Sequence, residues 1–211
     1  MNSKAIKEVK KNLVLSKTQR EILVGLLLGD GCLETQNGGR TYRLKVEHSE
    51  AQSDYVMWLY EIFKDWTPSG VYQRIRRDKY LHVGFQTYSH GSFRFYGKQF
   101  YPNGQKIIPK IIKKFLSPLA MAVWFMDDGS LKSRLHKTFI FHTYCFTKDD
   151  LKILQNALLE KFSIKSTLQA QKGRYWRLYI KEESAAIIRE IIAPVVDKFS
   201  SMKHKLTNVN A

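Results

Sequence analysis

Two similar apolar runs, Ile22 to Gly31 and Ala120 to Gly129, constrain this chain more than any other feature, because each stops abruptly on Asp-Gly. Both runs are apolar on every face, which predicts two buried helices, and each run is too short to span a bilayer. Two buried helices need partners, and each is the obvious partner of the other. The same structural pattern therefore occurs twice in the sequence.

The boundaries of both helices are marked by their flanking residues. Ser16 or Thr18 can cap the first helix, and Ser117 followed by Pro118 gives the second an N-cap and a proline at its first position. The glycine after each Asp is expected to end the helix in the left-handed conformation that glycine adopts most easily.

An acid at the end of each run points to a metal site. Gly25 and Gly29 lie four residues apart on one face, so the two helices can approach closely. Asp30 and Asp128 then meet at two negative helix ends, an arrangement that costs roughly 0.3–1 kcal/mol each without a cation. Converging carboxylates suit Mg²⁺ and suggest phosphodiester hydrolysis. A single such run is more often an ordinary core helix with an acidic end, but the repetition favours the metal site.

Both runs resemble the motif of the LAGLIDADG homing endonucleases, since Leu23 to Gly31 and Met121 to Gly129 align with the nine letters of that name. The resemblance is to the two-motif, single-chain branch, and Trp124 to Gly129 is similar to the second motif of its omega-type, intron-encoded members. It implies an α+β fold of two pseudo-symmetric αββαββα halves. The motif helices would form the seam, and two antiparallel sheets would form a saddle over DNA.

The resemblance also implies a function and a set of site residues. We expect a monomeric, site-specific endonuclease that uses Mg²⁺, with Mn²⁺ as a substitute. It would cut double-stranded DNA at a long non-palindromic target and leave short 3′ overhangs. The metal ligands would be the side chains of Asp30 and Asp128 and the backbones of Gly29 and Asp127. The contrasting class is a binding protein on the same fold, either an intron RNA maturase or a regulator that does not cut.

Two lysines resemble the paired active-site lysines of the family. These are Lys106 and Lys205, with Lys203 as a competing choice at the second site. Each would hold or deprotonate the attacking water, or stabilise charge on the phosphate. Without the resemblance, plain surface charge would be the better explanation for either lysine.

Water positioning is predicted to differ between the halves. Glu47 stands where the family often has a polar residue near the metal-bound water, and Tyr144 stands in the corresponding place after the second motif. The six histidines form no ligand pair at helical spacing, which disfavours a histidine-metal nuclease.

The net charge of +16, from 35 Lys and Arg against 19 Asp and Glu, favours a polyanionic partner. A two-stranded ribbon fits the major groove, where Arg or Lys reads guanine and Gln reads adenine. For any single basic side chain, a solvated strand face explains it equally well. The candidate DNA contacts are Arg40, Arg43, Lys45, Gln73, Arg74, Arg76, Arg77, Lys79, Gln86, Lys165, Gln169, Gln171, Lys172, Arg174 and Arg177.

Hydrophobic periodicity predicts the remaining elements. The predicted strands are 41–48, 71–77, 80–87, 138–143, 164–170 and 174–180, and the predicted helices are 54–63, 93–100, 148–162 and 183–192. The expected division is a basic N-terminal arm at 1–16, a first half at 17–103, a connecting segment at 104–116 and a second half at 117–211.

Only two cysteines are present, Cys32 and Cys145, and they match no metal-ligand spacing, which fits a reducing compartment inside the cell. If the gene is intron-encoded, that compartment would be a mitochondrion or chloroplast. No membrane partner is expected.

Overall fold

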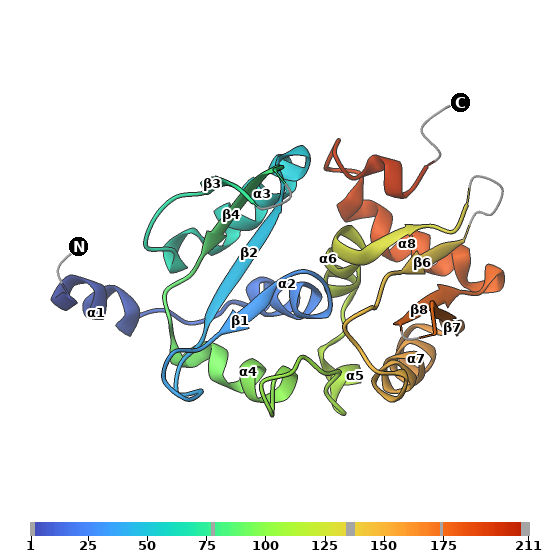
Figure 1. Cartoon of the computed structure of the whole chain (residues 1–211), viewed down its shortest axis with the longest axis horizontal. Coiled ribbons are helices and arrows are strands. Elements are labelled where there is room, and N and C mark those ends of the chain that lie inside the picture. Colours follow the sequence, from blue (N-terminus) through green and yellow to red (C-terminus); the bar gives the residue numbers. More distant parts are fainter. Residues whose placement is uncertain (1–2, 77–78, 134–137, 174, 208–211) are drawn as a thin grey trace.

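The chain forms two halves of the same plan, each with one four-stranded antiparallel sheet (Figure 1). This computed structural model describes residues 3–76, 79–133, 138–173 and 175–207. The first half contains α2 (Lys17–Leu28), β1 (Cys32–Glu34), β2 (Arg43–Ser49), α3 (Ser53–Phe63), β3 (Tyr72–Ile75), β4 (Leu81–Gln86) and α4 (Arg94–Phe100). The second contains α6 (Pro118–Asp128), β5 (Gly129–Leu131), β6 (Phe139–Phe141), α7 (Lys148–Phe162), β7 (Ser166–Gln171), β8 (Tyr175–Ile180) and α8 (Ala185–Val196). The predicted αββαββα order is therefore confirmed in both halves.

The sheets have matching strand orders, β1-β2-β4-β3 and β5-β6-β8-β7. Helices α2 and α6 pack against each other between them, α8 packs against α6, α3 packs on β2 and β4, and α7 contacts α5 (Ile112–Phe115) and β7 (Figure 1). Two further helices stand outside the repeat. Helix α5 lies between the halves, and α1 (Ser3–Lys11) gives the basic N-terminal arm a helical form and projects from the body (Figure 1).

Both seam helices begin where the sequence indicates. Ser16 accepts a hydrogen bond from the backbone of Gln19, whose side chain accepts one from the backbone of Ser16, so α2 starts with a capping box. Ser117 caps α6 through the backbone N–H of Ala120 at 3.1 Å, and Pro118 takes the first helical position.

The expectation of left-handed glycines at the helix ends is wrong. Gly31 and Gly129 both lack a positive φ, and Gly129 has an extended conformation at φ −82° and ψ 151°. Glycine is required at both positions because there is no room for a Cβ atom. A Cβ at Gly129 would lie 2.1 Å from the ring of Phe125, and a Cβ at Gly31 would lie 2.7 Å from the Cβ of Leu26.

Strands β1 and β5 have three residues each, which is too short for a period-two pattern to be recognised in the sequence. The other strands and helices of the two halves form within a few residues of their predicted positions, whereas α1 and α5 were not predicted as helices. Along β2, Leu44, Val46 and His48 are buried while Arg43 and Lys45 lie on the opposite face, as strict alternation requires.

The described residues include no helix that combines the length and apolar character needed to cross a membrane. All residues from Ile22 to Leu28 and from Ala120 to Met126 are buried. The two seam helices therefore owe their apolar character to burial in a shared core.

The closest point of the seam generates a prediction about stability. A Cβ at Gly25 would lie 2.6 Å from both the carbonyl oxygen of Ala120 and the Cβ of Val123. In an isolated helix Gly→Ala would be favourable by roughly 0.5–1 kcal/mol. We expect Gly25→Ala to lower the free energy of unfolding by about 1–3 kcal/mol instead, because the helices must separate. Urea unfolding measures this, with Gly70→Ala as the control, since nothing lies within 4 Å of a Cβ there. A stabilised Gly25→Ala variant would contradict the tight seam.

Candidate metal centre at the helix seam

The carboxyl ends of α2 and α6 touch. A Cβ at Gly29 would lie 2.4 Å from the Cβ of Asp127, so only glycine fits at this position. The backbone N–H of Asp30 donates to Asp127 Oδ2 at 2.9 Å and ties the turn after α2 to α6. Two negative helix ends therefore meet at one point, which disfavours further negative charge there.

Three carboxylates nevertheless converge on this point. The Asp30 side chain is 54% exposed, whereas the Asp127 side chain is fully buried. Burial, together with the charges of Asp30 and Asp128, raises the pKa of Asp127 well above its usual value. Burial and the charge of Asp30 raise the pKa of Asp128 to about 7. A cation bound here would relieve this repulsion, so the residues fit a divalent metal ion.

Two lysine ammonium groups lie at these helix ends, one at the end of α2 and one at the end of α6. Lys106 Nζ donates to the carbonyl oxygens of Gly29 at 2.6 Å and Gly31 at 2.9 Å. Lys205 Nζ donates to the carbonyl oxygens of Met126 at 2.5 Å and Asp127 at 3.1 Å. The backbone groups of Gly29 and Asp127 predicted as metal ligands thus accept hydrogen bonds from the two predicted lysines. Burial lowers the pKa of Lys205, although the nearby carboxylates oppose this.

Lys205, rather than the exposed Lys203, reaches the seam because contacts between the halves hold its segment. Asp54 at the start of α3 accepts hydrogen bonds from Ser200 Oγ at 3.2 Å and from the backbone N–H of Ser201 at 3.3 Å. Phe199 packs against Trp58 with ring centroids 5.2 Å apart. The C-terminal lysine of the second half is therefore positioned by a helix of the first half.

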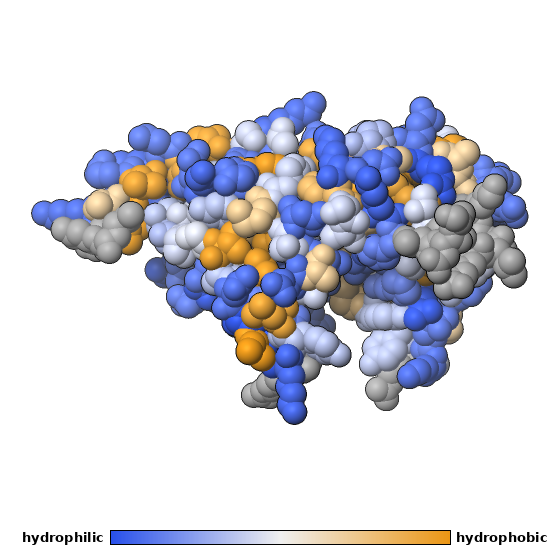
Figure 2. All heavy atoms as spheres, turned by 90° about the horizontal axis from the view of Figure 1, so that it is seen from above, coloured by the Kyte–Doolittle hydropathy of each residue, from blue (hydrophilic) through white to orange (hydrophobic). Residues whose placement is uncertain are grey.

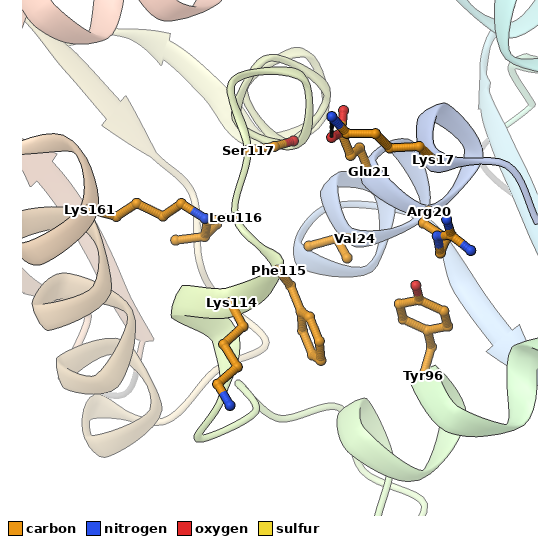
Figure 3. Close-up of a pocket in the computed structure, with 10 residues that line it drawn as sticks. All are labelled: Lys17, Arg20, Glu21, Val24, Tyr96, Lys114, Phe115, Leu116, Ser117 and Lys161. Atoms are coloured by element: carbon orange, nitrogen blue, oxygen red, sulfur yellow. Dashed lines mark ion pairs between the residues drawn. The ribbon is translucent and has the colours of Figure 1, made fainter.

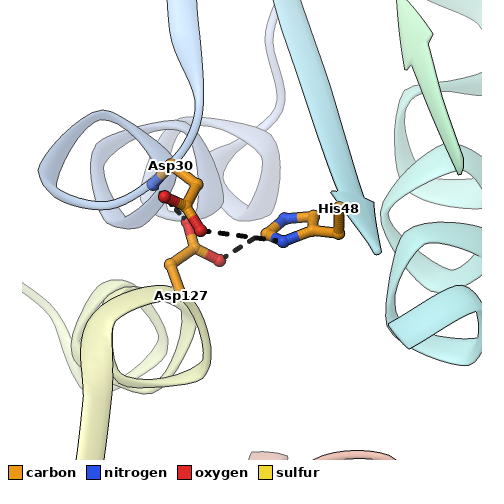
Figure 4. Close-up of side chains that lie close together, drawn as sticks. All are labelled: Asp30, His48 and Asp127. Atoms are coloured by element: carbon orange, nitrogen blue, oxygen red, sulfur yellow. Dashed lines mark hydrogen bonds and ion pairs between the residues drawn. The ribbon is translucent and has the colours of Figure 1, made fainter. Parts of the chain in front are cut away.

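His48 also faces this centre and was not predicted as a site residue. Its Nδ1 lies 3.8 Å from Asp30 Oδ2, and its Nε2 lies 3.7 Å from Asp127 Oδ1 (Figure 4). Tyr55 in α3 donates its hydroxyl to Asp127 Oδ1 at 2.9 Å. The alternation of β2 places His48 on the same face as Val46, so the sequence held a signal that this histidine points inward.

Glu47 points to the opposite face of the same sheet. It forms ion pairs with Arg74 and Arg76, both at 2.5 Å, and accepts a hydrogen bond from the Tyr72 hydroxyl at 2.9 Å. Burial alone would raise the pKa of Glu47, but hydrogen bonds from Arg74 and Tyr72, together with the charges of Arg76 and Arg74, outweigh it and leave the pKa lowered.

The strand register places His142, rather than Tyr144, at the position equivalent to Glu47. Cys32 pairs with Lys45 in the first sheet, and Ser130 pairs with Ile140 at the same distance after the second motif. Two residues beyond Lys45 and Ile140 lie Glu47 and His142. The imidazole of His142 contacts Ser130 Oγ at 3.0 Å and the Tyr144 hydroxyl at 3.3 Å. Tyr144 therefore does not occupy this position but contacts His142 from the adjacent turn. The Tyr144 hydroxyl also accepts a hydrogen bond from Arg177 Nε at 2.6 Å.

A pocket of about 340 Å³ joins the seam to the polar face of the first sheet. Its lining includes Asp30, Lys45, Glu47, His48, Arg76 and His82. The half-exposed carboxylate of Asp30 therefore lies in a pocket that basic side chains also line. Figure 2 shows the molecule hollowed between two lobes, with hydrophilic side chains on both sides of the hollow.

Cross-strand pairing shows which predicted DNA contacts share a face with Glu47. Arg43, Lys45, Arg74 and Gln86 do, whereas Gln73 pairs with buried Val83 and lies on the other face. In the second sheet, Gln169, Gln171 and Arg177 share one face.

The remaining predicted DNA contacts that the structure describes lie before, between or at the ends of the strands. Arg40 precedes β2, Lys79 and Lys172 lie at hairpin turns with positive φ, and Arg76 pairs with Glu47. Lys165 pairs with Glu183 at 3.4 Å, at the end of the β7–β8 hairpin away from its turn. Arg77 and Arg174 lie outside the described residues.

Known proteins resemble this chain over most of its length. It is 31% identical over 215 residues to DNA endonuclease I-ChuI of Chlamydomonas applanata, covering 93% of this chain and 97% of that protein. It is 30% identical over 205 residues to cytochrome b mRNA maturase bI2 of Debaryomyces hansenii, covering 93% and 76%.

The structure of the homing endonuclease I-WcaI bound to its DNA recognition sequence matches with a TM-score of 0.86 and 28% identity, covering 97% of this chain and 93% of that one. The sequence pattern described as the LAGLIDADG DNA endonuclease family matches residues 20–188. Because this match covers well over half of its 211 residues, the chain belongs to the LAGLIDADG DNA endonuclease family.

Proposed function

We propose that this protein is a single-chain, site-specific endonuclease that cuts both strands of a long, non-palindromic DNA target with a divalent cation. The observation that carries the proposal is the meeting of three carboxylates and two lysines at the carboxyl ends of α2 and α6. The similar homing endonuclease is bound to its DNA recognition sequence, and the net charge of +16 suits the same partner here.

The side chains of Asp30 and Asp128 would hold the cation, which supplies Lewis-acid activation of the phosphate and of a water nucleophile. Lys106 Nζ and Lys205 Nζ place positive charge at the same point, where negative charge accumulates on the phosphate during hydrolysis. The hydrogen bond from the Asp30 backbone to Asp127 holds the turn that carries the Asp30 carboxylate.

Recognition of the target would fall to the polar faces of the two sheets. Arg43, Lys45 and Arg74 on the first sheet, and Gln169 and Arg177 on the second, are of the types that read guanine and adenine edges in the major groove. Because the two faces carry different side chains, one chain would read two unlike half-sites, and no second chain is needed.

Removing either proposed metal ligand separates cutting from binding. We expect Asp30→Asn or Asp128→Asn to abolish double-strand cleavage while DNA affinity stays within about tenfold, because the sheets hold the DNA. Plasmid cleavage and filter binding measure the two quantities, and the exposed Asp65→Asn is the control. Undiminished cleavage by either seam variant would disprove the ligand assignment.

The raised pKa of Asp128, about 7, makes the metal requirement depend on pH. Only the deprotonated carboxylate binds a cation, so protons compete with Mg²⁺ below that pKa. The Mg²⁺ concentration for half-maximal cleavage should therefore rise as pH falls through 7, by up to about tenfold per unit, and level off above about pH 8. DNA binding without metal over the same range is the control. A constant Mg²⁺ requirement between about pH 6 and pH 8 would contradict this coupling.

A second candidate function is binding of intron RNA at the other end of the seam. A pocket of about 270 Å³ near the amino ends of α2 and α6 carries the basic residues Lys17, Arg20, Lys114 and Lys161 and the single acid Glu21 (Figure 3). Helix α2, with 12 residues and a rise of about 1.5 Å each, is about 18 Å long; the pocket lies along its first two turns, and the metal centre lies beyond its other end. The name of the Debaryomyces hansenii relative, an mRNA maturase, agrees with such a partner.

Charge reversal at this pocket tests the RNA proposal. We expect the double variant Arg20→Glu, Lys114→Glu to weaken binding of an intron transcript by at least about tenfold, while DNA cleavage stays near the wild-type rate. Exposed Lys152→Glu, on α7, is the control for reversing a charge at a different surface. RNA affinity that is equal in all three proteins would refute this surface as the RNA site.

A further inference from the structure

We propose that Asp30, His48 and Asp127 form a second cation site, which binds a transition-metal ion of the Zn²⁺ class. This site differs from the Asp30–Asp128 site for Mg²⁺ in its imidazole donor and in its use of the Asp127 side chain. It rests on the proposed function only in that Asp30 would serve both sites.

The geometry is close to that of a bound ion. Each of the three residues offers one ligand atom, and these atoms lie within 4.8 Å of one another. They come from three elements, the turn after α2, strand β2 and helix α6, and point toward one another (Figure 4). A zinc ion lies about 2.0–2.2 Å from nitrogen and oxygen ligands, so two ligands of a tetrahedral site are roughly 3.4 Å apart. Approach of the ligand atoms by up to about 1.4 Å, shared between the side chains, would close the site.

One polar atom at this site, the Nε2 of His48, is buried without a hydrogen-bond partner among the described residues. His48 as a whole is 5% exposed. The Asp127 side chain is fully buried, and it accepts hydrogen bonds from the Tyr55 hydroxyl and from the Asp30 backbone N–H. A buried imidazole and a buried carboxylate that face each other at 3.7 Å are costly without a shared proton or cation.

The donor set selects the class of ion. One imidazole and two carboxylates suit Zn²⁺, Co²⁺ or Ni²⁺, whereas Mg²⁺ prefers oxygen ligands and retains its waters. Tyr55 would orient Asp127 from outside the coordination sphere, as partners of metal ligands commonly do. Entry is through the 340 Å³ pocket, which Asp30 and His48 both line.

Sharing Asp30 makes the two sites antagonistic. An ion held between His48 and Asp127 would draw the Asp30 carboxylate away from Asp128 and the Mg²⁺ site. Low concentrations of Zn²⁺ should therefore inhibit cleavage supported by Mg²⁺.

The test is calorimetric titration of the full, DNA-free chain with Zn²⁺. Wild type should bind one ion with an affinity that falls at least about tenfold in His48→Gln and in Asp127→Asn. His142→Gln, which removes an imidazole near the same seam in the other half, should bind Zn²⁺ as wild type does. Thermal unfolding without metal checks that each variant is folded.

Two further measurements make the result decisive. On wild-type protein, Zn²⁺ should shift the NMR resonances of the His48 ring and leave those of His142 in place. The cleavage rate of each protein is first measured in Mg²⁺ alone, and Zn²⁺ is then added until that rate is halved. The Zn²⁺ concentration required should be at least about tenfold higher for His48→Gln than for wild type. Unchanged Zn²⁺ affinity in His48→Gln, or an unperturbed His48 ring, would overturn the proposal.

Asp128→Asn distinguishes this proposal from the proposed function. It should still bind Zn²⁺ as wild type does, although it no longer cuts DNA. Cleavage by Asp128→Asn would count against the Mg²⁺ site alone, whereas loss of its Zn²⁺ binding would show that the two sites are one and would overturn the second site.

Discussion

The contact between Gly29 and Asp127 is the constraint on which the rest of the structure depends. A Cβ at Gly29 would lie 2.4 Å from the Cβ of Asp127, so the carboxyl ends of α2 and α6 meet without any side chain between them. Each helix end carries a partial negative charge, and each is followed or closed by an Asp. Tight packing of the apolar faces therefore forces together groups that repel one another.

The chain offsets that repulsion with groups drawn from distant parts of the sequence. Lys106 and Lys205 donate hydrogen bonds to the carbonyl oxygens at the two helix ends, and Tyr55 donates to Asp127. The offset is incomplete, because the pKa of Asp128 remains raised to about 7 and that of Asp127 remains high. The energy of apolar burial along the seam thus maintains a point where negative charge is concentrated.

The two halves share a plan but differ in the groups beside the centre. In the first half Glu47 is held by Arg74, Arg76 and the Tyr72 hydroxyl. In the second half the equivalent position is His142, whose pKa is lowered by burial and by the charges of Arg177 and Lys205. An acid in one half and an imidazole in the other give the two scissile phosphates of the proposed reaction unlike surroundings.

Much of this protein could be predicted from the chain alone, because the determining signals are local. The apolar runs, their Ser caps and the alternation along β2 lie within short windows, and the duplicated motif implied two similar halves meeting at Asp30 and Asp128.

The role of glycine at the helix ends could not be predicted, since the clash of a Cβ at Gly129 with Phe125 depends on how the chain folds back. The equivalence of Glu47 and His142 depends on strand register, which hydrogen bonding between strands sets. The place of His48 between Asp30 and Asp127 depends on three elements that meet only after the seam has packed, because residues up to 97 positions apart there come within hydrogen-bonding distance.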